Sequence, residues 1–144
     1  MSYTPLRRGA QHYQALRAES AVAYASPHTL IQMMLEGLLE SIACAMGHMQ
    51  RSEMGKKGEE ISCAMAILDG LRMSLDKNAG GEIADNLDRL YDYISRTLLQ
   101  ANHENRVGKL EECAALVREI KSAWEGMPRE AVHAAEQVLQ QRAA

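Results

Sequence analysis

The sequence predicts an all-α protein: an antiparallel, up-and-down four-helix bundle with a mobile N-terminal arm and a short C-terminal helix. Apolar residues recur every three or four positions in four long segments, and residues typical of caps and turns separate these segments. No alternating β-branched segment bounded by turn residues occurs in the sequence. A chain of 144 residues is most simply one domain, which we divide into an arm (1–25), a bundle (26–126) and a C-terminal helix or tail (127–144).

The first 25 residues lack strong periodicity and contain Pro5 and Gly9, which predicts the arm. The first long helix then has a well-marked start, because Ser26 can accept a hydrogen bond from a free amide and Pro27 needs no amide partner there. Its apolar residues are Leu30, Ile31, Met34, Leu35, Leu38, Ile42, Ala45, Met46 and Met49. Adjacent apolar pairs such as Leu38–Leu39 make this face wider than one bundle seam requires, so the surplus predicts a partner site or a place where the arm folds back.

A polar turn over residues 50–57 is expected before the second helix, which we place at about 58–75. Asn78 and the pair Gly80–Gly81 should end that helix, because these residues tolerate the left-handed backbone of a helix stop. The third helix should span about 82–103. The residues expected on its inward side are Ile83, Leu87, Leu90, Tyr91, Ile94, Leu98 and Ala101.

A fourth helix is expected over about 106–125, with Asn105 as its N-terminal cap. The residues expected on its buried side are Leu110, Cys113, Ala114, Val117, Ile120 and Trp124. Gly126 and Pro128 should end it, and Pro128 can begin the short C-terminal helix that carries Val132, Ala135 and Leu139.

The composition of the chain argues against several classes of function. The net charge of -3 gives no general attraction to phosphate backbones, so a nucleic-acid partner is not expected. No apolar run approaches the roughly 20 residues of a membrane span, and a secretory signal is absent from the N-terminal sequence, so we expect a cytoplasmic protein. Cys44, Cys63 and Cys113 lie in helical apolar patterns without CxxC spacing, which predicts reduced, buried thiols.

The sequence predicts no catalytic, cofactor or metal site, and so no enzyme. A di-iron bundle needs paired Glu-x-x-His motifs, and only Glu130 and His133 have that spacing. The histidines near helix ends are expected to be mostly solvated. Nine methionines and no phenylalanine instead indicate adaptable apolar surface, which suits the binding of another polypeptide.

Several blocks of this sequence together resemble the FliS family of flagellar secretion chaperones. The resemblance covers about residues 13–124 and is carried by Ser20-Ala21-Val22, Ala25-Ser26-Pro27, Leu30-Ile31-Gln32-Met33, Glu36-Gly37, Ser74-Leu75-Asp76, Gly80 to Leu87, Leu90 to Ile94, Arg96, Leu98, Ala101-Asn102 and Ala123-Trp124. The chain departs from the family pattern at Leu35, Leu38 and Thr97, where an aromatic, a small residue and an arginine are usual.

This resemblance implies a cytosolic export chaperone that binds the C-terminal segment of flagellin in hydrophobic grooves. Binding would prevent premature polymerisation and deliver flagellin to a component of the flagellar type III export gate, with the arm covering a groove until flagellin displaces it. By position, the candidate partner-binding residues are Tyr13, Leu16, Ile31, Met34, Leu35, Leu38, Ile42, Leu71, Leu87, Tyr91, Ile94 and Leu98. The alternative is a structural helical homo-oligomer in which the apolar stripe forms a dimer interface.

Overall fold

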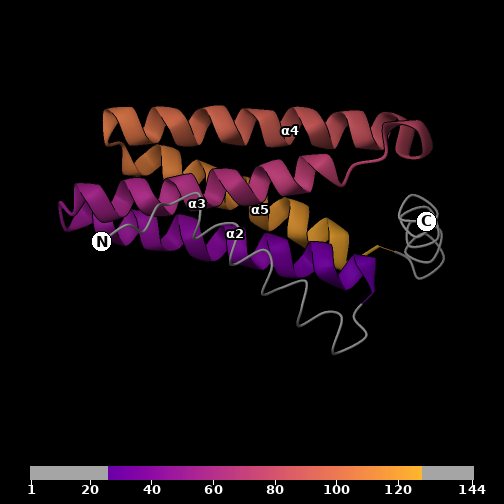
Figure 1. The fold of residues 1–144 in the computed structure, drawn as a ribbon, viewed down its shortest axis with the longest axis horizontal. Helices are drawn as coiled ribbons and strands as arrows, with labels where there is room; N and C mark the ends of the chain where they lie inside the picture. Colours follow the sequence, from indigo (N-terminus) through magenta and orange to yellow (C-terminus); the bar gives the residue numbers. More distant parts are fainter. Residues whose placement is uncertain (1–25, 128–144) are drawn as a thin grey trace.

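The computed structural model describes residues 26–127, and these residues form four helices and no strand. The helices are α2 (Pro27–Gln50), α3 (Met54–Met73), α4 (Lys77–Glu104) and α5 (Val107–Glu125). The predicted arm and C-terminal helix lie outside the described residues. Helix α2 packs against α3 and α5, and α4 packs against the same two helices from the other side (Figure 1). The predicted all-α four-helix bundle is therefore confirmed.

The start of α2 follows the sequence prediction. Ser26 has an extended backbone, and its hydroxyl accepts a hydrogen bond from the amide of Thr29 at 3.2 Å. Pro27 occupies the first turn, where a missing amide costs no helical hydrogen bond. The local sequence alone therefore fixes where this helix begins.

The core is formed by one face of each helix. Leu35, Leu38 and Ile42 on α2 are fully buried. They pack in one cluster with buried residues of the other three helices, among them Leu68, Ile94 and Leu110. The predicted inner face of α5 is confirmed, with Trp124 partly buried at its edge.

Two expected helix boundaries were wrong. Helix α3 begins at Met54, so the predicted polar turn is already helical near Lys57. The Lys57 side chain is buried, and its Nζ donates to the carbonyl of Asn102 at 2.9 Å and to Oδ1 of Asn105 at 2.5 Å. Asn105 does not cap α5: it ends α4 in the left-handed conformation, with φ 53° and ψ 45°. A lysine from α3 therefore satisfies carbonyl groups at the end of α4, which sequence spacing could not show.

The connection between α3 and α4 also differs from expectation. Residues 77–80 form a first helical turn of α4, and the Asp76 carboxylate accepts hydrogen bonds from the amides of Asn78 and Ala79. Gly81 then interrupts the helix with φ 54° and ψ -129°, a conformation open essentially only to glycine. The glycine pair therefore makes a break near the start of α4, rather than a loop that ends α3.

We expect Gly81→Ala to lower the free energy of unfolding by about 1–3 kcal/mol, because an alanine there is forced into a strained backbone conformation. A Cβ at residue 81 would meet no atom within 4 Å, so the loss would come from the backbone alone. Gly55→Ala is the matched control: its Cβ also meets nothing within 4 Å, but the residue is helical. Urea unfolding should show the control unchanged or stabilised, and equal effects of the two substitutions would contradict this account.

Candidate functional site

The apolar face of α2 is deeper in the bundle than the partner-binding prediction requires. Ile31, Met34, Leu35, Leu38 and Ile42 are all buried. Leu35 and Leu38, where the chain departs from the family pattern, are both at 0% exposure. The surplus width of the face is taken up by half-buried residues at its edges, which include Leu30, Leu39 and Met46. The structure therefore uses the centre of this face for the core.

The predicted site residues on the other helices are mostly core as well. Leu71, Tyr91, Ile94 and Leu98 are buried, and only Leu87 is partly exposed. Burial raises the pKa of Tyr91 to about 12, as expected for a phenol removed from water. Tyr13 and Leu16 lie outside the described residues. Contact of these residues with a partner stays a prediction, since none of the buried ones is accessible in the closed bundle.

An apolar surface that periodicity assigned to the core is instead exposed on α4. Ile83 and Leu90 were expected to point inward, but their exposures are 71% and 37%, and Leu87 between them is half-buried. Each of the three lies about three helical turns before one of the fully buried residues Ile94, Leu98 and Ala101. The same stripe of α4 is therefore buried in its second half and uncovered in its first half. We call Ile83, Leu87 and Leu90 the α4 apolar surface.

The course of α5 explains why this surface is uncovered. Helix α4 has 28 residues, whereas α5 has only 19. Figure 1 shows α5 beginning beside the end of α4 and running away from α4 towards the start of α2, where Trp124 stacks on His28. The first half of α4 buries Ala84 and Tyr91, which lie on another side of the helix, and leaves Ile83 and Leu90 exposed.

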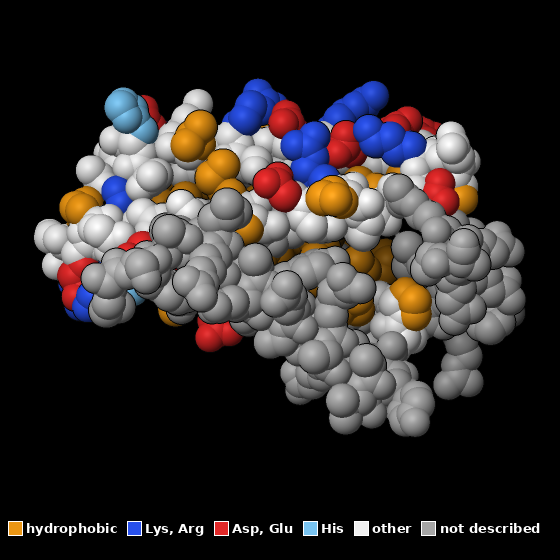
Figure 2. All heavy atoms as spheres, in the orientation of Figure 1, with side chains coloured by type: hydrophobic (Ala, Val, Ile, Leu, Met, Phe, Trp, Pro, Cys, Tyr) orange, Lys and Arg blue, Asp and Glu red, His pale blue; other side chains and the backbone are white. Residues whose placement is uncertain are grey.

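Ion pairs hold this part of α4 against α3. Arg72 Nε donates to Asp88 Oδ1 at 2.8 Å, and Lys77 Nζ donates to Asp88 Oδ2 at 3.0 Å. These bonds, that from Arg72 first, lower the pKa of Asp88. Charged side chains gather along α4 and its border with α3 (Figure 2). Because Asp88 is about 100° around the helix from Leu87, the charges do not cover the whole apolar surface.

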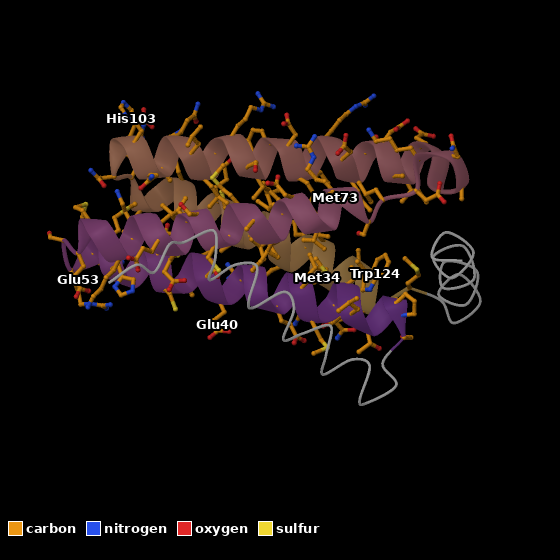
Figure 3. All side chains as sticks on the ribbon, viewed as in Figure 1. Met34, Glu40, Glu53, Met73, His103 and Trp124 are labelled. Atoms are coloured by element: carbon orange, nitrogen blue, oxygen red, sulfur yellow. The ribbon has the colours of Figure 1, made fainter. Side chains whose placement is uncertain are left out.

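A second apolar feature lies between α2 and α3 at the same end of the bundle. The two helices diverge there (Figure 1), and Figure 2 shows hydrophobic side chains at the bottom of a depression between them. Met73, at the end of α3, is 78% exposed, and Figure 3 shows it at this end. This end of the bundle therefore carries apolar groups that the described helices do not enclose.

Beside this depression, His28 and Trp124 join the start of α2 to the end of α5. Their rings stack with centroids 4.8 Å apart. His28 Nε2 lies 3.0 Å from the Trp124 carbonyl, and Trp124 Nε1 donates to the His28 carbonyl at 2.9 Å. His28 is half-buried in this contact, and the pair joins the two ends of the described chain.

The opposite end of the bundle is polar. Glu53, between α2 and α3, accepts hydrogen bonds from His48 Nδ1 at 3.0 Å and Arg51 Nε at 2.7 Å (Figure 3). These two bonds, that from His48 first, lower the pKa of Glu53 to about 2. The carboxylate is thus stabilised in its charged form by its neighbours.

This cluster predicts a pH dependence. A carboxyl group with a lowered folded-state pKa stabilises the fold above its unfolded pKa, and this contribution is lost as pH falls through the folded pKa, here between about 4.5 and about 2. We expect the difference in unfolding free energy between the native protein and its Glu53→Gln variant to shrink over that interval in urea titrations. A difference that stays constant down to pH 2 would contradict the assignment.

Three further expectations concern a metal site, the cysteines and a membrane span. Within residues 26–127, no group of three or more His, Cys, Asp or Glu side chains is placed to hold a metal ion. Cys63 and Cys113 are buried as expected, but Cys44 is exposed, so that prediction is wrong for Cys44. By length and composition α2 would be long enough to cross a membrane, although its apolar face is the centre of the bundle core.

Comparison with known proteins gives a consistent result. The family model described as flagellar protein FliS matches residues 9–131. The flagellar secretion chaperone FliSB of Pseudomonas aeruginosa is 44% identical over 117 residues, covering 81% of this chain and 93% of its own length. The flagellar secretion chaperone FliS of Vibrio cholerae is 38% identical over 125 residues, covering 87% and 92%. That of Bacillus subtilis is 31% identical over 106 residues, covering 74% and 78%. With a match over most of its length, the chain belongs to the FliS family of flagellar proteins.

Proposed function

We propose that this protein is a cytoplasmic export chaperone that binds the C-terminal segment of flagellin, prevents its premature polymerisation and delivers it to the flagellar export gate. The observation that carries the proposal is the α4 apolar surface, a core-type stripe on which Ile83 and Leu90 are exposed and Leu87 is half-buried. Membership of a family whose relatives are named flagellar secretion chaperones supports this role. The function is binding, without a chemical step.

The geometry suits an amphipathic helix as ligand. Ile83, Leu87 and Leu90 are spaced so that a helix lying along α4 would bury its apolar face against them and continue the packing of the bundle. Flagellin held this way could not use the same apolar face for self-association. The affinity should come mainly from buried apolar area, because the nearby charges of Arg72, Lys77 and Asp88 already pair with one another.

The proposed contact surface differs from the residues expected by position. Leu87 is kept, and Ile83, Leu90 and Met73 are added because their side chains are exposed at the open end of the bundle. The buried candidates on α2, such as Met34 and Leu38, would contact flagellin only if the helices separated. We therefore assign them to the core that supports the surface. A role for Tyr13 and Leu16 as a cover for a groove remains part of the proposal.

Calorimetry against a synthetic flagellin C-terminal peptide tests this function. We expect binding at micromolar or lower concentration with a clearly negative heat-capacity change, because apolar surface is buried. The control is the same peptide with its apolar positions replaced by serine, which should not bind. Absence of binding would contradict the proposal. A dimer that persists on dilution and does not bind the peptide would favour the structural homo-oligomer.

A further inference from the structure

The first turn of α4 is bent back towards the rest of the helix. Gly81 interrupts the helix with φ 54° and ψ -129°. On the far side of this break, the backbone of Gly80 lies against Ala84, and a Cβ built on Gly80 would be only 2.8 Å from the Ala84 Cβ. In a regular helix, Cβ atoms four residues apart are separated by about 5–6 Å. We call the bent turn, residues 77–80, the strap.

The strap covers a residue on the inner face of α4. Ala84 is 4% exposed, whereas its neighbours Ile83 and Asp85 are exposed. Ala84 precedes the buried Tyr91 by seven residues, so the two lie on the same side of the helix. The strap therefore contributes at Ala84 the cover that packed helices give to the inner face of α4 further along the chain.

One ion pair requires the bent geometry of the strap. Lys77 Nζ donates to Asp88 Oδ2 at 3.0 Å, although the two residues are 11 positions apart in sequence. In a straight helix this separation is about 16 Å along the axis, which is more than a lysine and an aspartate side chain can span together. The pair can therefore form only while the strap is bent, and we call it the latch.

The strap has a permissive hinge and a weak latch. Glycine adopts both the bent conformation seen at Gly81 and the helical one, so this residue does not oppose straightening. The Lys77 side chain is 57% exposed, and exposed ion pairs contribute little to stability because water and salt screen them. Asp88 also accepts from Arg72 Nε at 2.8 Å, so the carboxylate keeps a cationic partner when Lys77 leaves.

We infer that the strap is a lid beside the α4 apolar surface, which opens at Gly81 when the latch between Lys77 and Asp88 separates. Opening uncovers Ala84 and widens the surface, because Leu87 lies between Ile83 and Ala84 around the helix. The opening follows from the hinge and the latch, whereas its role in binding flagellin rests on the proposed function. Under that function, the apolar face of flagellin takes the place of the strap on Ala84.

Thiol labelling of an Ala84→Cys variant measures the opening without flagellin. The exposed Cys44 serves as the reference for a freely reacting thiol, and the buried Cys63 and Cys113 report unfolding of the whole bundle. Adding Lys77→Gln removes the latch and should raise the labelling rate of the introduced thiol several-fold, while Cys63 and Cys113 stay unlabelled. An unchanged rate, or a rise shared by the buried thiols, would overturn the inference.

A matched variant controls for the lost charge. Lys56 is also exposed and pairs with Glu53 at 3.7 Å, far from the strap in sequence. Lys56→Gln therefore makes the same change in net charge and should leave the labelling rate at residue 84 unaltered. Lys77→Arg, which keeps a cation at the latch, should restore slow labelling. Equal rates in the Lys56→Gln and Lys77→Gln chains would contradict a specific latch.

Two further measurements avoid reliance on the cysteine at residue 84. In chains that keep Ala84, relaxation of its methyl protons by a soluble nitroxide should rise several-fold on Lys77→Gln, with the fully buried Ala101 methyl as reference. Gly81→Ala disfavours the bent backbone and should have the same effect, whereas Gly55→Ala should have none. An Ala84 methyl that stays as protected as that of Ala101 in both variants would overturn the inference.

The flagellin C-terminal peptide separates this inference from the proposed function. Binding that is several-fold tighter for the Lys77→Gln chain than for the unaltered chain supports competition between the strap and flagellin. Equal affinities in the presence of faster labelling would overturn that competition. If no chain binds the peptide while Lys77→Gln still exposes residue 84, the lid stands and the proposed function fails. If all chains bind it and residue 84 is never exposed, the lid fails and the proposed function stands.

Discussion

Replacing Ile83 by aspartate should weaken binding of the flagellin peptide by roughly 10- to 100-fold. Burying an isoleucine side chain against a partner contributes about 1.5–3 kcal/mol, and each 1.4 kcal/mol is about a factor of ten in affinity. The free energy of unfolding should change little, because Ile83 is 71% exposed and substitutions at such positions alter stability by about 0.5 kcal/mol or less. Calorimetry for binding and urea unfolding for stability measure the two effects on the same samples.

Leu99→Asp is the matched control for this experiment. Leu99 is on the same helix and is 57% exposed, but it lies on the far side of α4 from the apolar stripe and in its second half. The control should therefore retain the affinity of the unaltered protein. Equal losses of affinity for the two variants would show that the peptide does not recognise the α4 apolar surface.

Leu38→Ala should have the largest effect on stability. Leu38 is fully buried at the centre of α2, within the cluster that joins all four helices. Truncating a buried leucine side chain at its Cβ leaves a cavity and lowers the free energy of unfolding by about 2–5 kcal/mol. Urea unfolding should therefore show a much lower midpoint with a similar slope.

This variant also distinguishes core from contact surface. If Leu38 is core, as the structure shows, the fraction of the variant that remains folded should bind the flagellin peptide with nearly unchanged affinity. If Leu38 were a direct contact, affinity would fall while stability changed little. Leu99→Ala should change neither quantity, because that side chain is exposed and outside the proposed surface.

Local signals in the sequence predicted much of the fold. The cap at Ser26, the periodicity of α2 and α5, and the turn residues between helices are properties of short stretches of chain, and they correctly indicated four helices. The predicted helix boundaries were wrong where a residue distant in sequence determined them. Lys57 on α3 reaches Asn105 at the end of α4, so neither the start of α3 nor the role of Asn105 could be inferred from neighbours in sequence.

The candidate site was harder to predict for a related reason. Apolar spacing identifies the stripe that runs from Ile83 to Ala101, but every member has the same local pattern. Whether a member is core or surface depends on which helix lies opposite and how far that helix extends. The prediction therefore placed Ile83 and Leu90 inside, and it assigned partner contacts to Leu35 and Leu38, which the packing buries completely.

The sequence by itself determined the class of fold, the family and the buried faces of α2 and α5, because caps, periodicity and family blocks are properties of residues close together in the chain. Only the tertiary structure decided which part of those faces is free. The physical reason is that an apolar side chain is buried only where another helix packs against it, and α5 runs away from the first half of α4 (Figure 1). In the first half of α4, the stripe that stabilises the bundle further along the helix becomes the surface we propose for flagellin.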